Sequence, residues 1–420
     1  MDGDPAVEPE LDSFSLTFPL SYRVAFIVVL AVWGWGANLH YLYLRKIDVP
    51  SLIRYPGRSS PHHPTHHLST YRFATALSAI YAFSLLVFWA FTHRNPALVL
   101  AWDWLPLTYL GLLLALFAAP LGGGRNNYLS GAGRSRLRST LRRVAVGGLA
   151  EAKDGKFGDI LLADVLTSYA KVLADFFVAL CMFLRSESQG GSASATARPD
   201  RACGGAVAVP LILAAPSLIR LRQCLIEYAR VRRGPTSAET GWGGQHLANA
   251  LKYSTAFPVI VLGALQRGDG GDGPSYHRAW VVACAVNSLY SFYWDVAKDW
   301  DLTLLDGRRG ARDNQAFGLR RSLWLGPPAL YYGVVALDLA LRHTWALKLS
   351  ARLGPLADLE GGLFLVQFLE VFRRWVWIFF RVETEWVRGQ AALPNLGEDD
   401  ILLGDFEAGG FQGKYEDDDD

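Results

Sequence analysis

The chain has 420 residues, of which 51% are hydrophobic and only 19% are charged, with a formal net charge of +2. Soluble globular chains carry about 25% charged residues, and a chain this apolar is neither intrinsically disordered nor a disulfide-dense scaffold. It also lacks the strongly basic balance of a nucleic-acid-binding domain, so we expect no nucleic-acid partner. The apolar residues come in blocks of about 20, separated by short basic or Gly/Ser-rich stretches, which is typical of a protein that crosses a membrane several times.

Apolar runs long enough to cross a hydrocarbon core of about 30 Å occur about nine times along the chain. In chain order they cover residues 20–44, 71–92, 98–120, 159–184, 205–226, 247–266, 276–298, 327–349 and 361–381. The fourth, fifth, seventh and ninth runs contain charged residues, which makes their boundaries less sharp. The pattern predicts an all-α, polytopic helical membrane protein with about nine transmembrane helices.

Basic residues are concentrated in four connections that fall on one side of this arrangement. They are Arg45, Lys46, Arg54 and Arg58 after the first span, Arg125, Arg134, Arg136, Arg138, Arg142 and Arg143 after the third, Arg230, Arg232 and Arg233 after the fifth, and Arg308, Arg309, Arg312, Arg320 and Arg321 after the seventh. Because basic loops stay on the cytosolic side, we expect a lumenal or external N-terminus and a cytosolic C-terminus.

The chain is therefore expected to divide into five segments. These are an acidic lumenal tail (1–19), N-terminal transmembrane helices (20–120), a basic cytosolic segment (121–158), the main transmembrane domain (159–388) and an acidic, disordered cytosolic tail (389–420). Within the basic segment, the arginine-rich stretch 134–143 fits a short helix lying on anionic lipid and a solvated loop about equally well.

The cysteines and histidines give no clear structural or metal site. Cys181, Cys224 and Cys284 lie in or beside apolar blocks and Cys203 stands alone in a loop, so we expect no structural disulfide. The histidines of HHPTHH (62–67) could bind a metal, but the prolines around them break helical spacing and no acid or cysteine lies near. We therefore expect neither a metal nor a cofactor.

Several ionisable residues lie inside the predicted spans, where each costs about 2.5–3.5 kcal/mol to insert. For Lys171, Asp175, Arg381, Glu383 and Glu385 we expect structural ion pairs, or side chains that reach the membrane surface.

Three further arginines lie too deep in the last two spans for that interpretation, because together they would cost on the order of 8–10 kcal/mol. We expect them to line one wet cavity together with nearby acids. Bases outnumber acids in this set, and guanidinium groups match the oxygens of phosphate or carboxylate. The candidate residues are Arg342, Arg373 and Arg374, with Lys252 and Tyr253 as further donors and Asp164, Asp295 and Glu370 as acids. The site is predicted to bind a small oxyanion, and the activity that fits is permeation.

Five sequence blocks around these residues resemble the EXS-domain family. They are LLADVLTS (161–168), PSLIRLRQCL (216–225), HLANALKYST (246–255), the WD-x-x-x-DW at 294–300 and LEVFRRWVWIFFRVETEW (369–386). An upstream WGWGANL (33–39) is similar to the first conserved helix of the family. The last block is the most specific, and the matches together extend over nearly the whole chain.

The family includes plant and animal phosphate exporters, the xenotropic retrovirus receptor and a yeast protein needed to retain proteins in the ER and Golgi. The resemblance implies transport of inorganic phosphate through the helices of an EXS transmembrane domain at 159–388. It assigns phosphate contacts to Lys252, Tyr253, Arg342, Trp345, Arg373 and Arg374, with Trp345 also a gate, Arg220 as a further pathway base, and Asp164, Asp295 and Glu370 as pathway acids.

The exporters carry an N-terminal SPX domain, whereas here only the acidic residues 1–19 precede the first span. The chain therefore resembles the member without an SPX domain, the yeast ER-retention-defective protein. That resemblance implies a Golgi membrane transporter that returns phosphate released by lumenal glycosylation to the cytosol and supports the recycling of Golgi glycosyltransferases. Residence in the ER or plasma membrane is the alternative, and the family suggests a homodimer.

A different class of function also stays open. The protein could be a sorting adaptor without transport activity, whose cytosolic loops or acidic tail bind coat proteins or glycosyltransferases. An enzyme is not expected, because no H-E-x-x-H or G-x-S-x-G motif provides a poised base or nucleophile.

Overall fold

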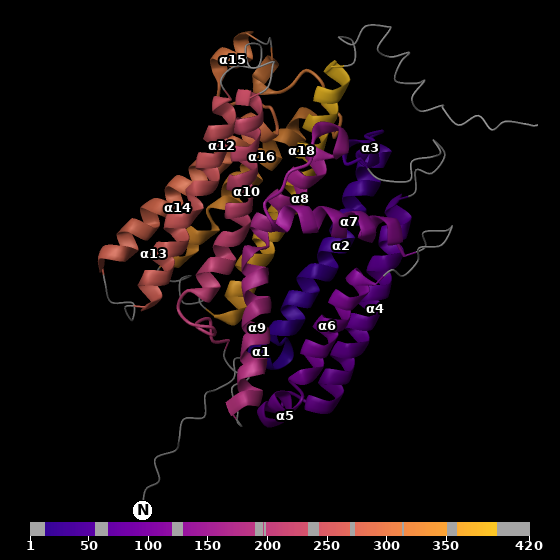
Figure 1. Cartoon of the computed structure of the whole chain (residues 1–420), viewed down its shortest axis with the longest axis vertical. Coiled ribbons are helices and arrows are strands. Elements are labelled where there is room, and N and C mark those ends of the chain that lie inside the picture. The colour runs from indigo at the N-terminus through magenta and orange to yellow at the C-terminus, as the bar shows by residue number, and fades with distance from the viewer. Residues whose placement is uncertain are drawn as a thin grey trace, which may run out of the picture.

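The computed structural model describes residues 13–54, 66–119, 129–189, 196, 199–233, 243–268, 274–312, 315–350 and 359–392. Within these residues the regular structure is helical and no strand occurs, which confirms the predicted all-α class. Most long helices run along the long axis of the molecule, whereas the basic helix α7 (Gly131–Ala145) lies across it (Figure 1).

The helices fall into a few groups along the chain. The N-terminal part holds α1 (Ser13–Thr17), α2 (Leu20–Leu44), α3 (Val49–Leu52), α4 (His66–Thr92), α5 (Pro96–Ala101) and α6 (Trp104–Ala118). After α7 come α8 (Lys156–Ser168), α9 (Ala170–Gln189), α10 (Ala208–Arg233), α12 (Gly244–Ser254) and α13 (Ala256–Gly268). The C-terminal part holds α14 (Pro274–Trp294), α15 (Gly307–Arg312), α16 (Pro328–Arg342) and α18 (Glu360–Ala392).

Five stretches of these helices are long and apolar enough to cross a membrane, and the bent pair α8 and α9 raises the number to six. The other predicted spans are helical too, but α14 and α18 are too polar and α16, with 15 residues, is too short to qualify alone. The predicted number of about nine transmembrane helices therefore stays a prediction, and so does the orientation.

The described helices of three of the predicted basic connections lie in the upper half of the molecule in Figure 1. The short helices α3 and α15, which belong to the first and last of these connections, lie toward the top in Figure 1, and α5 lies at the bottom. The stretch 134–143 forms part of α7, so the solvated-loop interpretation of that stretch is wrong. In Figure 1, α7 lies across the molecule below α3 and α15, so the basic helices are spread over its upper half.

Two glycines of the WGWGANL block allow α2 to lie close to its neighbours. A Cβ atom added at Gly34 would lie 2.9 Å from Cδ1 of Trp375 in α18, and one at Gly36 would lie 2.8 Å from the Tyr71 ring in α4. The Trp375 indole also donates a 2.9 Å hydrogen bond to the carbonyl of Gly34. The block therefore fixes the contact between the first long helix and the helix that carries the paired arginines.

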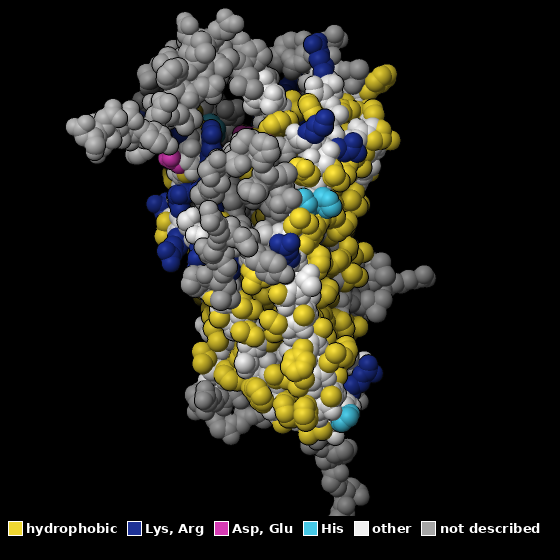
Figure 2. All heavy atoms as spheres, turned by 90° about the vertical axis from the view of Figure 1, so that its right-hand side faces the viewer, with side chains coloured by type: hydrophobic (Ala, Val, Ile, Leu, Met, Phe, Trp, Pro, Cys, Tyr) yellow, Lys and Arg dark blue, Asp and Glu magenta, His cyan; other side chains and the backbone are white. Residues whose placement is uncertain are grey.

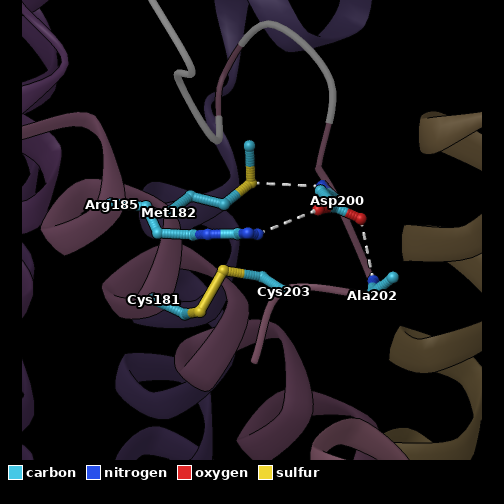
Figure 3. Close-up of a disulfide and its surroundings, with 6 residues drawn as sticks. All are labelled: Cys181, Met182, Arg185, Asp200, Ala202 and Cys203. Atoms are coloured by element: carbon cyan, nitrogen blue, oxygen red, sulfur yellow. Dashed lines mark hydrogen bonds and ion pairs between the residues drawn. A yellow bond between two sulfur atoms is a disulfide. The ribbon is translucent and has the colours of Figure 1, made fainter. Parts of the chain in front are cut away.

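The expectation of no structural disulfide is wrong. Cys181 in α9 and Cys203 in the following connection form a disulfide with their Cα atoms 6.1 Å apart (Figure 3). The connection folds back onto the end of α9, where the amide of Asp200 donates to Sδ of Met182 and its carboxylate lies 3.9 Å from Arg185. Sequence spacing gave no sign of this return, because 22 residues separate the two cysteines. Cys224 and Cys284 are buried free thiols.

Loss of this disulfide should destabilise the protein. Closing a loop of this length removes chain entropy from the unfolded state that corresponds to about 3 kcal/mol, so Cys203→Ala should lower the free energy of unfolding by about that amount. Thermal unfolding of purified protein in mild detergent measures the change. A reducing agent should lower the stability of the wild type and leave the Cys203→Ala variant unaffected; an equal effect on both proteins would refute the prediction.

Candidate functional site

The charged residues predicted from the sequence lie where four helices are interrupted. The axis bends by 63° between α8 and α9 at Tyr169, and α12 gives way to α13 at Thr255. The α14 helix continues into a π-helical turn at Asp295–Asp299, and α16 ends at Arg342. Inside a membrane, irregular backbone is tolerated only where protein or water satisfies its polar groups, and broken helices often mark transport sites.

One part of the site is the buried pair of Arg220 in α10 and Asp164 in α8. The guanidinium donates from Nε to the Asp164 carboxylate at 2.7 Å and to the Tyr253 hydroxyl at 3.2 Å. Tyr253 donates its own proton to the same carboxylate, and Nη1 of Arg220 donates to Gln223 at 2.7 Å. Arg220 and Asp164 are 2% and 3% exposed. Their charges are therefore neutralised by direct contact and not by water.

Asp295 is the centre of the second part. Its carboxylate contacts Arg342, lies 3.3 Å from Nη1 of Arg373 and lies 3.7 Å from Nζ of Lys252. The π turn also brings Asp299 within 3.6 Å of Lys252. Both contacts of Lys252 with carboxylates exceed hydrogen-bond distance, and its ammonium group also lies 5.0 and 5.9 Å from the ring centres of Tyr253 and Trp294.

Asp338 is a member of this site that the sequence analysis missed. It accepts from Nε of Arg342 at 3.2 Å and from Nη1 of Arg373 at 2.9 Å, and it is 3% exposed. Asp338 precedes Arg342 by four residues, so the helical spacing that places them on one face could have indicated it. Arg373 is also bound by Glu370 through Nε at 2.9 Å and Nη2 at 2.7 Å.

Arg374 differs from every other cation of the site. Its Nε donates to the hydroxyl of Ser168 at 2.9 Å and its Nη2 to that of Thr167 at 3.3 Å, while the guanidinium lies 4.5 Å from the Trp377 ring centre. Nη1 is buried and has no hydrogen-bond partner. Within the described ranges Arg374 contacts no carboxylate, although the residue is only 5% exposed. Ser168 in turn donates to Glu370, so it links the two arginines of α18.

We call these residues the charge network. Its members are the cations Arg220, Lys252, Arg342, Arg373 and Arg374 and the acids Asp164, Asp295, Asp299, Asp338 and Glu370. These five cations equal the five acids, so the network as defined has no excess of base; Asp299 also lies 4.0 Å from Arg381, which pairs with Glu385. On the side of Arg373 and Asp338 the space between side chains is too small for a water molecule, and a wet cavity elsewhere around these residues stays a prediction.

Trp345, the predicted gate, lies outside the charge network. It follows Arg342 in the 3₁₀ helix Thr344–Leu349, and its indole donates to Ser288 at 2.9 Å. Ser288 donates in turn to the backbone carbonyl of Arg342 at 3.1 Å. Trp345 therefore touches the end of α16, and a gating role stays a prediction.

Several charges expected to be structural form ion pairs. Arg381 pairs with Glu385 at 3.0 Å, and Asp175 lies 3.9 Å from Arg201. Glu383 is buried, pairs with Arg320 and accepts from the amide of Leu325 at 3.1 Å, so it anchors the connection before α16.

The histidine cluster carries no metal site that the structure describes. His62 and His63 lie outside the described residues, and the His67 ring stacks on the ring of His40 with their centres 4.4 Å apart. Among the described side chains, no three histidine, cysteine or acidic residues are arranged to hold a metal ion.

Removing Arg220 should strongly destabilise the protein. An unpaired buried carboxylate costs about 3–5 kcal/mol, so Arg220→Gln should lower the free energy of unfolding by about that amount. The double variant Asp164→Asn/Arg220→Gln should be more stable than Arg220→Gln alone, since no lone charge remains. Lys153→Gln, which breaks an exposed 3.4 Å pair with Glu151, is the control and should cost at most about 1 kcal/mol. Denaturant unfolding in mild detergent gives these values, and a fully additive double variant would contradict the direct coupling of Asp164 and Arg220.

Comparison with known proteins covers nearly the whole length of the chain. The profile of the EXS family matches residues 18–387. Protein ERD1 homolog 1 of Schizosaccharomyces pombe is 30% identical over 385 residues, which are 90% of this chain and 94% of that protein. Protein ERD1 homolog 2 of the same yeast is 25% identical over 87% of this chain and 95% of its own length.

The relatives of a second group are longer proteins than this chain. Solute carrier family 53 member 1 of Mus spretus is 30% identical over 253 residues, which are 58% of this chain and 33% of that protein. The match of the family profile includes the WGWGANL block, the interrupted helices and the paired arginines of α18. The chain is a membrane protein of the EXS family.

Proposed function

We propose that this protein is an inorganic phosphate transporter of the Golgi membrane, which moves phosphate released by lumenal glycosylation to the cytosol and so supports recycling of Golgi glycosyltransferases. The observation that carries the proposal is the environment of Arg374. Its guanidinium is buried, makes no ion pair among the described residues and leaves Nη1 without an acceptor. A lone buried cation is costly, so the site favours an anion that supplies the missing charge and acceptors.

Lys252 is the second cation available to such an anion. Its contacts with carboxylates are long, 3.6 Å to Asp299 and 3.7 Å to Asp295, so its N–H donors can turn toward a new acceptor. Phosphate has several acceptor oxygens and a charge of one to two at neutral pH. It therefore matches the forked donors of arginine and the point charge of lysine.

The acids of the charge network explain how such a site could release its substrate. Asp295 and Asp338 occupy the donors of Arg342 and Arg373 that phosphate oxygens would otherwise use. Entering phosphate must displace these carboxylates, so part of its binding energy is offset. A transport site has to bind its substrate weakly enough to release it. Competition from these carboxylates lowers the affinity for phosphate.

Two features support the proposed orientation, in which the basic connections lie in the cytosol. Basic connections remain on the cytosolic side of membranes, and disulfides persist in oxidising compartments such as the secretory lumen. The Cys181–Cys203 disulfide lies toward the end of α9 that is remote from α3 and α15. The named relation to a solute carrier supports transport, and the Golgi is proposed from the resemblance to the ER-retention-defective protein.

Phosphate flux through purified protein tests the proposal. In liposomes loaded with labelled phosphate, the wild type should give flux above that of empty liposomes. Arg374→Gln should reduce that flux about 10- to 100-fold, since a hydrogen bond to a charged group is worth about 1.5–3 kcal/mol. Lys153→Gln, remote from the charge network and exposed, should transport normally.

Normal flux in a folded Arg374→Gln variant would overturn the proposal. The sorting-adaptor alternative is separated by deleting residues 389–420, which lie mostly outside the described residues. Loss of glycosyltransferase retention with intact flux after this deletion would assign retention to the tail and not to transport.

A further inference from the structure

A large apolar cavity borders the charge network at Arg374, which is one of its lining residues. Its volume is about 780 Å³, and α2, α4, α6, α7, α8 and α18 contribute to its walls. This volume is within the range of about 300–1,000 Å³ found for small-molecule sites. Apolar side chains line most of it, including Val28, Val32, Phe73, Phe117, Val371 and Phe372.

A cavity with such an apolar lining is stable neither empty nor filled with water. A large empty cavity forfeits the contacts of its walls, and water is retained only where it finds two to four polar partners. For a protein that lies in a bilayer, the surrounding hydrocarbon is the available filling. The rim reaches the surface at Trp33 of α2 and Leu137 of α7, which are 36% and 37% exposed, so an acyl chain has a way in.

The polar end of the cavity belongs to α7. This helix has five arginines and no acid in the sequence GAGRSRLRSTLRRVA. Arg136 lines the cavity and uses Nη2 for the carbonyls of Ile53 at 3.0 Å and Asp154 at 3.2 Å. Its Nε and Nη1 groups make no hydrogen bond among the described residues, so they are free to donate to an anionic group at the rim.

The position of α7 fits the surface of a bilayer. The helix lies across the long axis of the molecule, and Leu137, Leu141 and Val146 are exposed beside its arginines. Figure 2 shows Lys and Arg side chains mainly over the upper part of the adjacent face and mostly hydrophobic side chains below them. A basic amphipathic helix in this setting lies at the level of lipid headgroups.

We propose that the cavity binds one anionic phospholipid, with an acyl chain among the apolar walls and the headgroup phosphate at Arg136. The positive charge of α7 favours an anionic over a zwitterionic headgroup. The lipid would pack on the back of the elements that carry the charge network. Leu161, Leu162 and Val165 of α8 line the cavity, while Asp164 and Ser168 of the same helix belong to or bind the network.

Lipid retention by the full chain tests the headgroup contact. Protein in nanodiscs of equal phosphatidylserine and phosphatidylcholine with matched acyl chains is transferred to mild detergent in phosphate-free buffer, and native mass spectrometry identifies the bound lipid. The wild type should retain one phosphatidylserine. Arg136→Gln, which removes a headgroup donor that lines the cavity, should weaken this retention about fivefold or more, and Arg142→Gln, which removes the same charge from the same helix but no cavity wall, should weaken it clearly less.

A second pair of variants tests the acyl chain. Ala37 of α2 lines the cavity, so Ala37→Phe should fill part of it and reduce lipid retention. Ala82→Phe, on the exposed face of α4, is the matched control and should retain lipid like the wild type. Thermal unfolding of both variants shows whether the fold persists, and Ala31→Phe provides a second filling of the same cavity if Ala37→Phe does not fold.

Three results of these measurements would overturn the proposal, and a competition experiment adds a fourth. They are a wild type that retains no phospholipid, equal retention of the two headgroups, and unchanged retention in Arg136→Gln and in the folded cavity-filling variant. Release of the lipid by excess inorganic phosphate would also overturn it, because it would reveal a site for free phosphate. Since binding is measured without phosphate, its failure is distinct from a failure of phosphate transport.

Discussion

The balance of charge inside the helix bundle is the constraint on which the rest of the structure depends. Five cations face five carboxylates, seven of these ten residues are buried, and each cation except Arg374 lies against at least one acid. Ions removed from water cost several kcal/mol each unless a partner lies in contact. The packing around α18 therefore cannot vary freely, because a shift of one helix would leave a charge without its partner.

The interrupted helices are a consequence of this constraint. The break after α8 places Ser168 between Arg374 and Glu370, and the π turn after α14 brings Asp295 and Asp299 to the same lysine. Breaks near a shared centre also give the bundle several points at which segments could move relative to one another, as alternating access requires.

Apolar run length and buried charge were enough to predict the helical class and most members of the charge network, whereas Arg220 came only from the family resemblance, and Asp338 and Asp299 were not assigned to the site. Asp338 could have been found from its spacing to Arg342, whereas the Cys181–Cys203 pairing could not, because it depends on how a long connection returns to α9. The equal number of acids and bases in the network could not be predicted either. The sequence indicates which charged residues lie in the membrane but not which of them are in contact. The cavity beside α8 depends on side-chain volumes from six helices, which no single apolar run of the sequence shows.

The central claim is that phosphate competes with carboxylates of the protein for the same buried cations. The most direct test is the equilibrium dissociation constant of phosphate for purified wild type and for Asp295→Asn, measured by isothermal titration calorimetry in mild detergent. Asparagine keeps the size of the side chain and removes the competing charge at the centre of the charge network. The account predicts tighter phosphate binding by Asp295→Asn than by the wild type. Weaker or unchanged binding by a folded variant would contradict it.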